Sequence, residues 1–300
     1  MCRRSPWLGA RALVAAAIAV ANALPISAGA QRGNEILQRV DRLLTPDSYE
    51  SYRRLTNVEP SGRHREYLLY SVARGREKVA AFFLSPASDR GRATLRLGDN
   101  MWLYIPNAGK PVRITNLQTV VGGVFNNADI LALDYSAEYD VVSQEDSGTE
   151  ILLHLQAKTR TVAYDKLRMW VTNDRYVPTR IECLTAASML IKTLYFNDVK
   201  DFGGGLVRPS VIETDSPLYK GYKSSIVFAD IKKRSFGDEV FTLTFLPNLE
   251  SLRRLGFRRP SLFCSAWRPR SRVVRTSPHG FQRSSENRTP SGGSSKRARQ

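Results

Sequence analysis

The apolar residues of this chain recur at every second position through much of its length, and this period constrains the fold more than any other feature. Successive side chains of a β-strand point to opposite faces of a sheet, so a period of two is typical of strands. The alternating runs predict about eleven strands, at residues 67–74, 78–84, 93–97, 101–105, 151–157, 164–172, 179–184, 189–196, 207–214, 222–231 and 240–246. The chain is therefore expected to be mainly β.

The connections between these runs are short and contain turn-forming residues such as Gly75, Gly98 and the Gly203–Gly205 run. Loops this short join neighbouring antiparallel strands, whereas parallel strands need a crossover of roughly a dozen residues or more. Helical spacing of apolar residues is limited to residues 34–44 and to a segment at 126–139. The sequence thus predicts an antiparallel meander with a few helices.

Two of the predicted strands, at residues 78–84 and 100–105, have no polar face. A strand that is apolar on both faces must be covered on both sides. One arrangement packs helices on one face and a partner sheet on the other. Another is a curved, partly closed barrel whose concave face holds an apolar ligand under a lid of helices. Periodicity alone favours neither.

The first 30 residues have the pattern of a secretory signal peptide. Three arginines accompany an apolar run at residues 12–23, and Ala28-Gly29-Ala30 fits a cleavage site. The apolar run is shorter than the roughly 20 residues that a membrane-spanning helix needs. No cysteine directly follows the run to carry a lipid. We expect a mature, soluble protein that begins near Gln31 and acts outside the cytoplasm.

The formal net charge of +17 is concentrated at the two ends of the chain. Thirteen Lys and Arg residues lie beyond Glu250 against the single acidic residue Glu286, whereas residues 31–250 are close to neutral. Residues 251–300 are rich in Arg, Ser and Pro, which predicts a disordered tail. This tail is either an electrostatic arm for anionic lipid headgroups or a stretch without an evolved role. Residues 31–250 are the predicted folded domain, and no nucleic-acid partner is expected.

Few groups in the sequence suggest catalysis or metal binding. The three histidines have no partner at metal-ligand spacing, and no nucleophile elbow, phosphate loop or dinucleotide motif occurs. Asp129, Asp134, Glu138 and Asp140 are interpreted as caps and as the polar face of the helical segment, not as an acid/base pair. Cys183 is interpreted as an ordinary strand residue. No catalytic residue, metal site or cofactor is predicted.

The string Gly98-Asp-Asn-Met-Trp-Leu-Tyr-Ile-Pro106, followed by Lys-Pro-Val-Arg-Ile at residues 110–114, resembles the LolA-like family of outer-membrane lipoprotein-sorting proteins. Residues 125–130 resemble a helical segment of the same family, with Asn126 in place of the usual Ser or Thr. The resemblance extends over roughly residues 34–250. It implies an incomplete antiparallel β-barrel, like that of LolA and LolB, wrapped around helices and enclosing an apolar cavity for acyl chains.

The function that the resemblance implies is a periplasmic carrier or chaperone, not an enzyme. Such a carrier would bind the acyl chains of lipoproteins or other envelope lipids and deliver them toward the outer membrane. Its implied partners are an inner-membrane transporter and an outer-membrane acceptor, and a monomer is expected. Two alternatives stay open: an envelope-stress sensor that binds mislocalised lipoproteins and a membrane regulator, and a lipid hydrolase with the same cavity. The aromatic residues predicted to face the concave side and bind lipid are Phe82, Trp102, Tyr104, Trp170, Phe196 and Phe228.

Overall fold

The computed structural model describes residues 28–119, 121–131 and 134–256. Residues 1–27 of the expected signal peptide and residues 257–300 of the expected tail lie outside this part of the chain, whereas residues 251–256, expected to be disordered, are helical. The first element is helix α1 (Ala28–Leu44), which includes the helix predicted at residues 34–44. Within the described ranges, no helix combines the length and the apolar character that crossing a bilayer requires.

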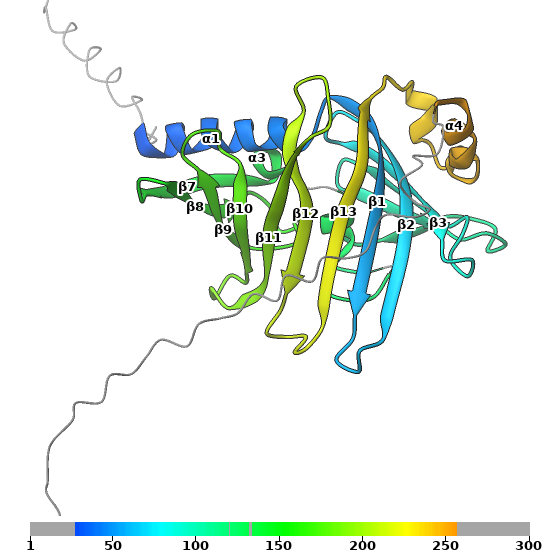
Figure 1. The fold of residues 1–300 in the computed structure, drawn as a ribbon, viewed down its shortest axis with the longest axis horizontal. Helices are drawn as coiled ribbons and strands as arrows, with labels where there is room; N and C mark the ends of the chain where they lie inside the picture. Colours follow the sequence, from blue (N-terminus) through cyan, green and yellow to red (C-terminus); the bar gives the residue numbers. More distant parts are fainter. Residues whose placement is uncertain (1–27, 120, 132–133, 257–300) are drawn as a thin grey trace, which may run out of the picture. The chain divides into compact units, whose positions relative to one another are not determined.

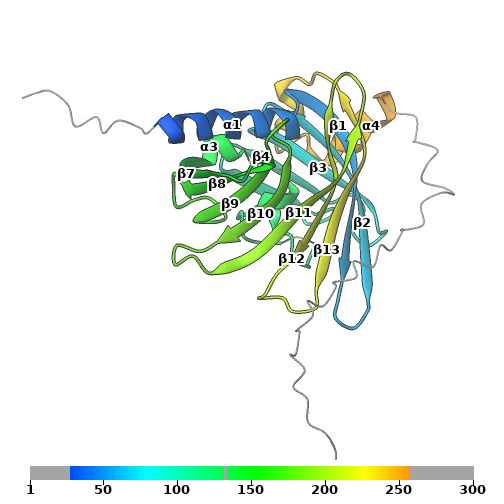
Figure 2. The same ribbon diagram turned by 60° about the vertical axis from the view of Figure 1, so that its left-hand side comes forward.

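Thirteen antiparallel strands form a single curved sheet (Figures 1 and 2). They are β1 (Ser48–Val58), β2 (His64–Arg74), β3 (Lys78–Ser85), β4 (Ala93–Leu97), β5 (Asn100–Tyr104), β6 (Val112–Ile114), β7 (Tyr139–Asp146), β8 (Glu150–Ala157), β9 (Lys166–Thr172), β10 (Pro178–Leu184), β11 (Leu190–Asp201), β12 (Val207–Asp215) and β13 (Lys223–Lys233). Strands β6 and β7 are the two edges, and β1 pairs with β13 in the interior of the sheet. Because the edges do not pair, the sheet stays open, which confirms the predicted incomplete barrel.

Ten of the eleven strands predicted from the sequence are present. The eleventh, at residues 240–246, is wrong. That segment contributes instead to two short 3₁₀ helices, η1 (Asp238–Phe241) and η2 (Leu246–Asn248), which precede helix α4 (Leu249–Gly256). Pro247 lies at the start of η2, where its missing N–H is tolerated, whereas the same residue would remove a hydrogen bond from a strand.

Three strands, β1, β6 and β7, were not predicted because their apolar alternation is weak. Strand β1 buries Glu50, Arg53 and Asn57 among its apolar residues, so polar side chains occur on both of its faces. Strand β6 has only three residues, and β7 is an edge strand whose second half is largely exposed. A search for alternating apolar residues therefore does not detect them.

The main hydrophobic core lies on the concave side of the sheet, under α1, α2 (Asn127–Ile130) and α3 (Tyr135–Glu138). Helix α1 lies across one end of the sheet and contacts β7, β12 and α3 (Figures 1 and 2). Its side chains Leu37 and Val40 are completely buried. The apolar stripe of α1 thus closes one end of the concave core.

A second apolar layer covers the convex side of the strands β1 to β5. Tyr52, Tyr70 and Phe82 are buried outside the main core, and the ring centres of Tyr52 and Tyr70 lie 5.4 Å apart. Helix η1, with its buried Phe241, contacts β3, and η2 contacts β4. The run at residues 78–84 is therefore buried by the main core on one face and covered by η1 on the other, and no partner sheet packs on it within the described ranges.

Asp41 connects α1 to α3. Its two carboxylate oxygens accept hydrogen bonds from the backbone N–H groups of Tyr135 at 3.0 Å and Ser136 at 2.8 Å. Arg76 Nη1 lies 3.5 Å from the same carboxylate. Burial raises the pKa of Asp41 to about 6, although the hydrogen bonds from Ser136 favour the charged form. The folded protein therefore holds a proton on Asp41 at pH values where the unfolded chain has lost it.

We expect the free energy of unfolding to fall as the pH rises from about 4 to about 6, because the folded state binds the Asp41 proton more tightly than the unfolded chain. The contribution of this group is about 2 kcal/mol, and it levels off above pH 6. Urea unfolding at pH 4.5 and pH 7 measures it as the difference between the protein and the Asp41→Asn variant. Asp140→Asn, at an exposed position, is the control. A difference that does not change with pH would contradict the assignment.

The loop that precedes α2 lies against the centre of the sheet. The amide of Asn57 donates to the carbonyl oxygens of Val121 and Gly122 at 3.1 and 3.0 Å, and the hydroxyl of Ser224 donates to Asn57 Oδ1 at 2.7 Å. Gly122 and Gly123 have φ angles of +71° and +78°. A Cβ on Gly123 would overlap Asn57 and lie 2.7 Å from Ser224 Oγ, whereas a Cβ on Gly122 meets nothing within 4 Å. These two adjacent glycines differ in the space around them.

Gly123→Ala should therefore destabilise the protein more than Gly122→Ala. Both variants carry the left-handed backbone penalty of about 1–2 kcal/mol. Gly123→Ala also displaces buried hydrogen-bonded groups, which adds about 1–3 kcal/mol. Urea unfolding of the two variants gives the comparison. Equal losses of stability would mean that the loop can move away from β1 without cost.

Candidate functional site

A small cavity of about 50 Å³ lies in the concave core, between the end of α1, the covering helices α2 and α3, and strands β1, β11, β12 and β13. Its lining residues are Leu44, Thr45, Tyr49, Arg53, Phe125, Asp129, Tyr135, Leu194, Phe196, Arg208, Ile212 and Phe228. One water molecule occupies about 30 Å³ in the liquid. In this conformation the cavity can therefore hold one or two water-sized molecules, and an acyl chain needs the covering helices to move.

The covering helix α2 is held on the sheet by polar groups. Asn126 caps it: its side chain accepts from the N–H of Asp129 at 3.1 Å, and the Asp129 carboxylate accepts from the N–H of Asn126 at 2.8 Å. Lys192 of β11 forms a buried ion pair with Asp129 and donates to the carbonyl oxygen of Val124 at 3.1 Å. The hydroxyl of Tyr164 donates to Asp129 at 3.1 Å. One carboxylate thus fixes both the start of α2 and its position over β11.

The other carboxylates of this segment also have structural partners. Asp134 caps α3 by accepting from the N–H of Ala137 at 3.1 Å. Glu138 forms an ion pair with Arg96 of β4 at 2.6 Å, and both side chains are buried. Asp129 and Asp134 thus act in helix capping, as the sequence predicted, whereas Glu138 is buried against β4 and is not part of an exposed polar face.

Arg53 of β1 connects the sheet to the end of α2. It donates hydrogen bonds of 2.5 Å to the carbonyl oxygen of Ile130 and to the hydroxyl of Ser71. Arg53 is only 5% exposed, and its buried Nε has no hydrogen-bond partner among the residues that the structure describes. Movement of α2 away from the sheet would break the contact with Ile130 and leave this guanidinium facing the cavity.

Arg208 of β12 is a second buried cation on the cavity wall, with 4% exposure. Its Nη1 donates to the carbonyl oxygen of Leu44 and its Nε to that of Pro209 at 3.2 Å. The guanidinium carbons of Arg208 and Arg53 lie 4.3 and 5.8 Å from the centre of the Phe228 ring. Phe228 therefore contacts two cations inside the core.

The cavity has excess positive charge. Among the described residues that line the cavity, Asp129 alone has a carboxylate, and it is paired with Lys192. In the described part of the chain, Arg53 and Arg208 form no ion pair with a carboxylate. Burial lowers the pKa of Arg208 to about 10 and also lowers the pKa of Arg53. A pKa of about 10 still leaves Arg208 charged at neutral pH.

The structure brings two of the six predicted lipid-binding residues together. Phe196 of β11 and Phe228 of β13 both lie in the concave core and line the cavity. Their roles in binding stay predictions. Their position follows from register, since Phe196 pairs with Ile212, which pairs with Ile226 two residues before Phe228.

The other four residues lie on the convex side, away from the cavity, so the expectation that they face the concave side needs correction. Phe82 pairs with Tyr70 and Tyr104 lies opposite Ala93, both outside the main core. Trp102 is half-buried on the same side. Trp170 is half-buried, and the Arg180 guanidinium lies 3.7 Å from its ring centre. Successive side chains of a strand point to opposite faces of the sheet. In a strand that is apolar on both faces, the sequence therefore does not show which set of alternate residues faces the concave side.

We did not predict the buried residues Arg53, Arg208, Lys192 and Asp41, because aromatic residues were expected to line the cavity. The sequence did contain a signal for two of them. Arg208 lies four residues before Ile212 in β12, and Lys192 lies two residues before Leu194 in β11, so each shares a face of its strand with an apolar residue that contacts the core. A charged side chain on the strand face that points toward the core is buried together with the apolar side chains of that face, and its burial requires hydrogen-bond partners.

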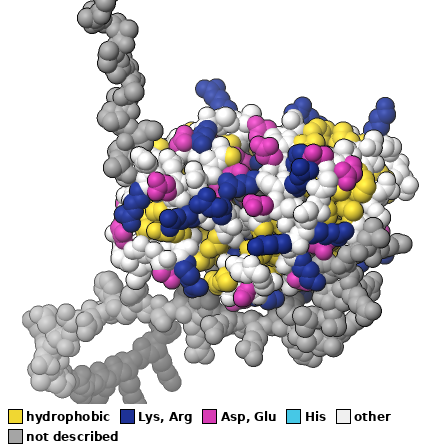
Figure 3. Space-filling view, turned by 90° about the horizontal axis from the view of Figure 1, so that it is seen from above, with side chains coloured by type: hydrophobic (Ala, Val, Ile, Leu, Met, Phe, Trp, Pro, Cys, Tyr) yellow, Lys and Arg dark blue, Asp and Glu magenta, His cyan; other side chains and the backbone are white. Residues whose placement is uncertain are grey.

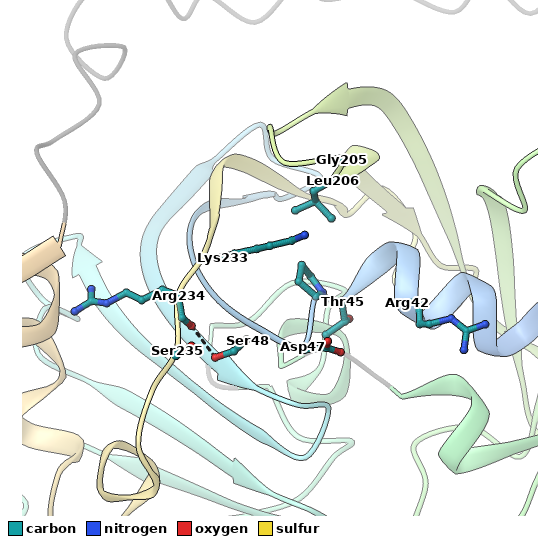
Figure 4. A pocket seen from close by; sticks show the side chains of 10 residues that line it. Arg42, Thr45, Asp47, Ser48, Gly205, Leu206, Lys233, Arg234 and Ser235 are labelled. Atoms are coloured by element: carbon teal, nitrogen blue, oxygen red, sulfur yellow. Dashed lines mark hydrogen bonds between the residues drawn. The ribbon is translucent and has the colours of Figure 1, made fainter.

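A larger depression of about 550 Å³ lies on the surface at the end of α1 (Figure 4). Its walls include Arg42, Asp47, Lys233 and Arg234, and Lys233 extends between Leu206 and the turn after α1 (Figure 4). Thr45 lines both this depression and the internal cavity. The turn after α1 therefore separates the cavity from the surface.

The surface around this depression is mixed in charge. Figure 3 shows Lys and Arg side chains interspersed with Asp and Glu, and apolar side chains between them, over the face that is uppermost in Figure 1. No group of three or more potential metal-binding side chains occurs in the ranges 28–119, 121–131 and 134–256.

Residues 75–248 match the model of a family described as uncharacterized proteins. None of the curated proteins matches the chain. Among solved structures, a LolA superfamily protein from Nitrosomonas europaea is 26% identical, with a TM-score of 0.65, and the match covers 71% of this chain and 98% of that protein.

Two further structures show the same fold. A domain from Vibrio parahaemolyticus, named for outer-membrane lipoprotein sorting, and a DUF1329 family protein from Desulfovibrio piger are each 19% identical, with TM-scores of 0.62. Each match covers 73% of this chain and 99% of the other protein. The open antiparallel sheet of this chain is thus similar in fold to the LolA superfamily structure, and the chain belongs to the family of uncharacterized proteins that the model describes.

Proposed function

We propose that this protein is a periplasmic carrier that holds acyl chains of lipoproteins or other envelope lipids between its curved sheet and helices α1–α3. In this proposal residues 1–30 are a cleaved signal peptide, residues 31–250 are the lipid-binding domain and residues 251–300 are a basic tail. The partners are an inner-membrane transporter and an outer-membrane acceptor, and no catalytic step is involved.

The observation that carries the proposal is a concave apolar core that is covered by very short helices. Helices α2 and α3 have four residues each, too few to be stable without tertiary contacts. They are fixed by specific polar contacts, such as those of Arg53 with Ile130 and Lys192 with Asp129. A helix attached in this way can separate from a sheet that stays paired, because none of its hydrogen bonds belongs to the strand ladder.

The energetics of acyl binding support such an opening. Each methylene group removed from water contributes about 0.8 kcal/mol, so a chain of sixteen carbons contributes roughly 12 kcal/mol. This gain can offset the separation of α2 from Arg53 and from Lys192 and the exposure of part of the core. Delivery then requires an acceptor that binds the same chain more tightly, because a carrier can transfer ligand only toward lower free energy.

Substitution of one cavity residue tests the proposal. Phe196→Ala should weaken the binding of a fluorescent sixteen-carbon acyl probe about tenfold, which corresponds to about 1.4 kcal/mol of lost contact. Fluorescence titration of the full chain measures the dissociation constant. Phe241→Ala is the matched control, because Phe241 is a buried phenylalanine on the convex side.

The control should lose stability but keep its affinity for the probe within a factor of two. Equal weakening in both variants would place the acyl chain outside the concave core. If the unsubstituted protein does not bind the probe, the carrier function is wrong.

A further inference from the structure

The cavity contains more positive charge than a site for a purely apolar ligand requires. Burial of a charge is unfavourable, and buried cations are ordinarily paired with acidic side chains. Arg53 and Arg208 instead bond to carbonyl oxygens and a hydroxyl, and both lie near the ring of Phe228. Both guanidiniums are at least 95% buried.

One polar atom of the two arginines has an unused hydrogen-bonding capacity in the described residues. Arg53 Nε is buried and lacks a hydrogen-bond partner within the described residues, and the Nη1 atom of Arg53 bonds to a carbonyl of the cover. When α2 moves, that Nη1 also loses its partner. An opened cavity would thus expose the Arg53 guanidinium, with its Nε and Nη1 lacking a hydrogen-bond acceptor, next to the guanidinium of Arg208 on β12.

The remaining groups around the two arginines do not supply the missing negative charge. Asp129 is shared between Lys192 and Tyr164. Tyr49 and Tyr135, which also line the cavity, are phenols, and burial raises the pKa of Tyr135 well above its usual range. Burial therefore keeps the Tyr135 phenol in its neutral form.

We propose that the ligand carries an acidic head group, a carboxylate or a phosphate, which binds between Arg53 and Arg208 while its acyl chain lies along Phe125, Leu194 and Phe196. This inference rests on the proposed carrier function and narrows its ligand to an anionic amphiphile. Guanidinium groups form strong, charge-assisted hydrogen bonds to both kinds of head group. Arg53 and Arg208 would act as the specificity residues, and the apolar wall would supply the affinity.

The first test compares three ligands of the same chain length on the full-length protein at pH 8: palmitate, hexadecyl phosphate and hexadecanol. Each displaces an uncharged fluorescent acyl probe. We expect at least one of the two acids to bind tenfold or more tightly than the alcohol, and the tighter of the two identifies the head group. Equal binding of all three ligands would overturn the inference but leave the carrier function intact. If none of the three binds, the carrier function and the inference both fail.

The second test separates the buried arginines from the general basic charge of the protein. Arg208→Met should reduce the preference for the acid to less than threefold, with little change in the affinity for hexadecanol. Arg180→Met is the matched control, because it removes an arginine stacked on an aromatic ring, Trp170, on the convex side. This control should keep the preference.

Arg208→Gln, which keeps donors for the Leu44 and Pro209 carbonyls, gives a second neutral variant if Arg208→Met does not fold. The inference is overturned if the neutral variants of Arg208 keep the preference for the acid, or if Arg180→Met loses it to the same extent. Either result would mean that the general basic charge of the protein causes the preference.

Discussion

The buried ion pair between Lys192 and Asp129 is the interaction on which the closed arrangement of this protein depends. It joins strand β11 to the first turn of α2, and both side chains are almost completely buried. Loss of one partner from such a pair leaves an uncompensated charge in the core, which costs about 3–5 kcal/mol. A helix of four residues has no comparable stability of its own. The position of α2, and with it the closed state of the cavity, therefore depends on this pair and on the Arg53 contact with Ile130.

The shape of the sheet explains why its concave face needs a cover of helices. Thirteen antiparallel strands that do not close into a barrel leave a concave face too apolar to meet water, and α1, α2 and α3 cover it. The convex side of strands β1 to β5 is covered separately by η1, η2 and α4, which follow the last strand. On the concave side, buried polar groups attach the cover, and these contacts surround the cavity that a ligand would enlarge.

Much of the fold could be predicted from the sequence, because a period of two identifies strands wherever one face is apolar. That signal fails in β1, where Glu50, Arg53 and Asn57 interrupt the alternation. It also fails at residues 240–246, which were expected to form a strand but form parts of two 3₁₀ helices, the second of which contains Pro247.

The residues of the candidate site were harder to predict than the strands. Phe196 and Phe228 line the cavity, but Phe82 and Trp170 lie on the other side of the sheet, because the sequence of a strand does not show which face is concave. The burial of Arg53 follows from its register, which places it opposite Phe228 and Leu69, two residues of the core.

The most direct test of the central claim, that the concave core opens to hold an acyl chain, is native mass spectrometry of the full-length protein purified without detergent from its own cell envelope. We expect a fraction of the molecules to carry an additional mass that is removed by organic extraction and contains an acyl group. Protein that is reproducibly free of any such mass, although it is purified from an envelope that contains the lipids, would contradict the account.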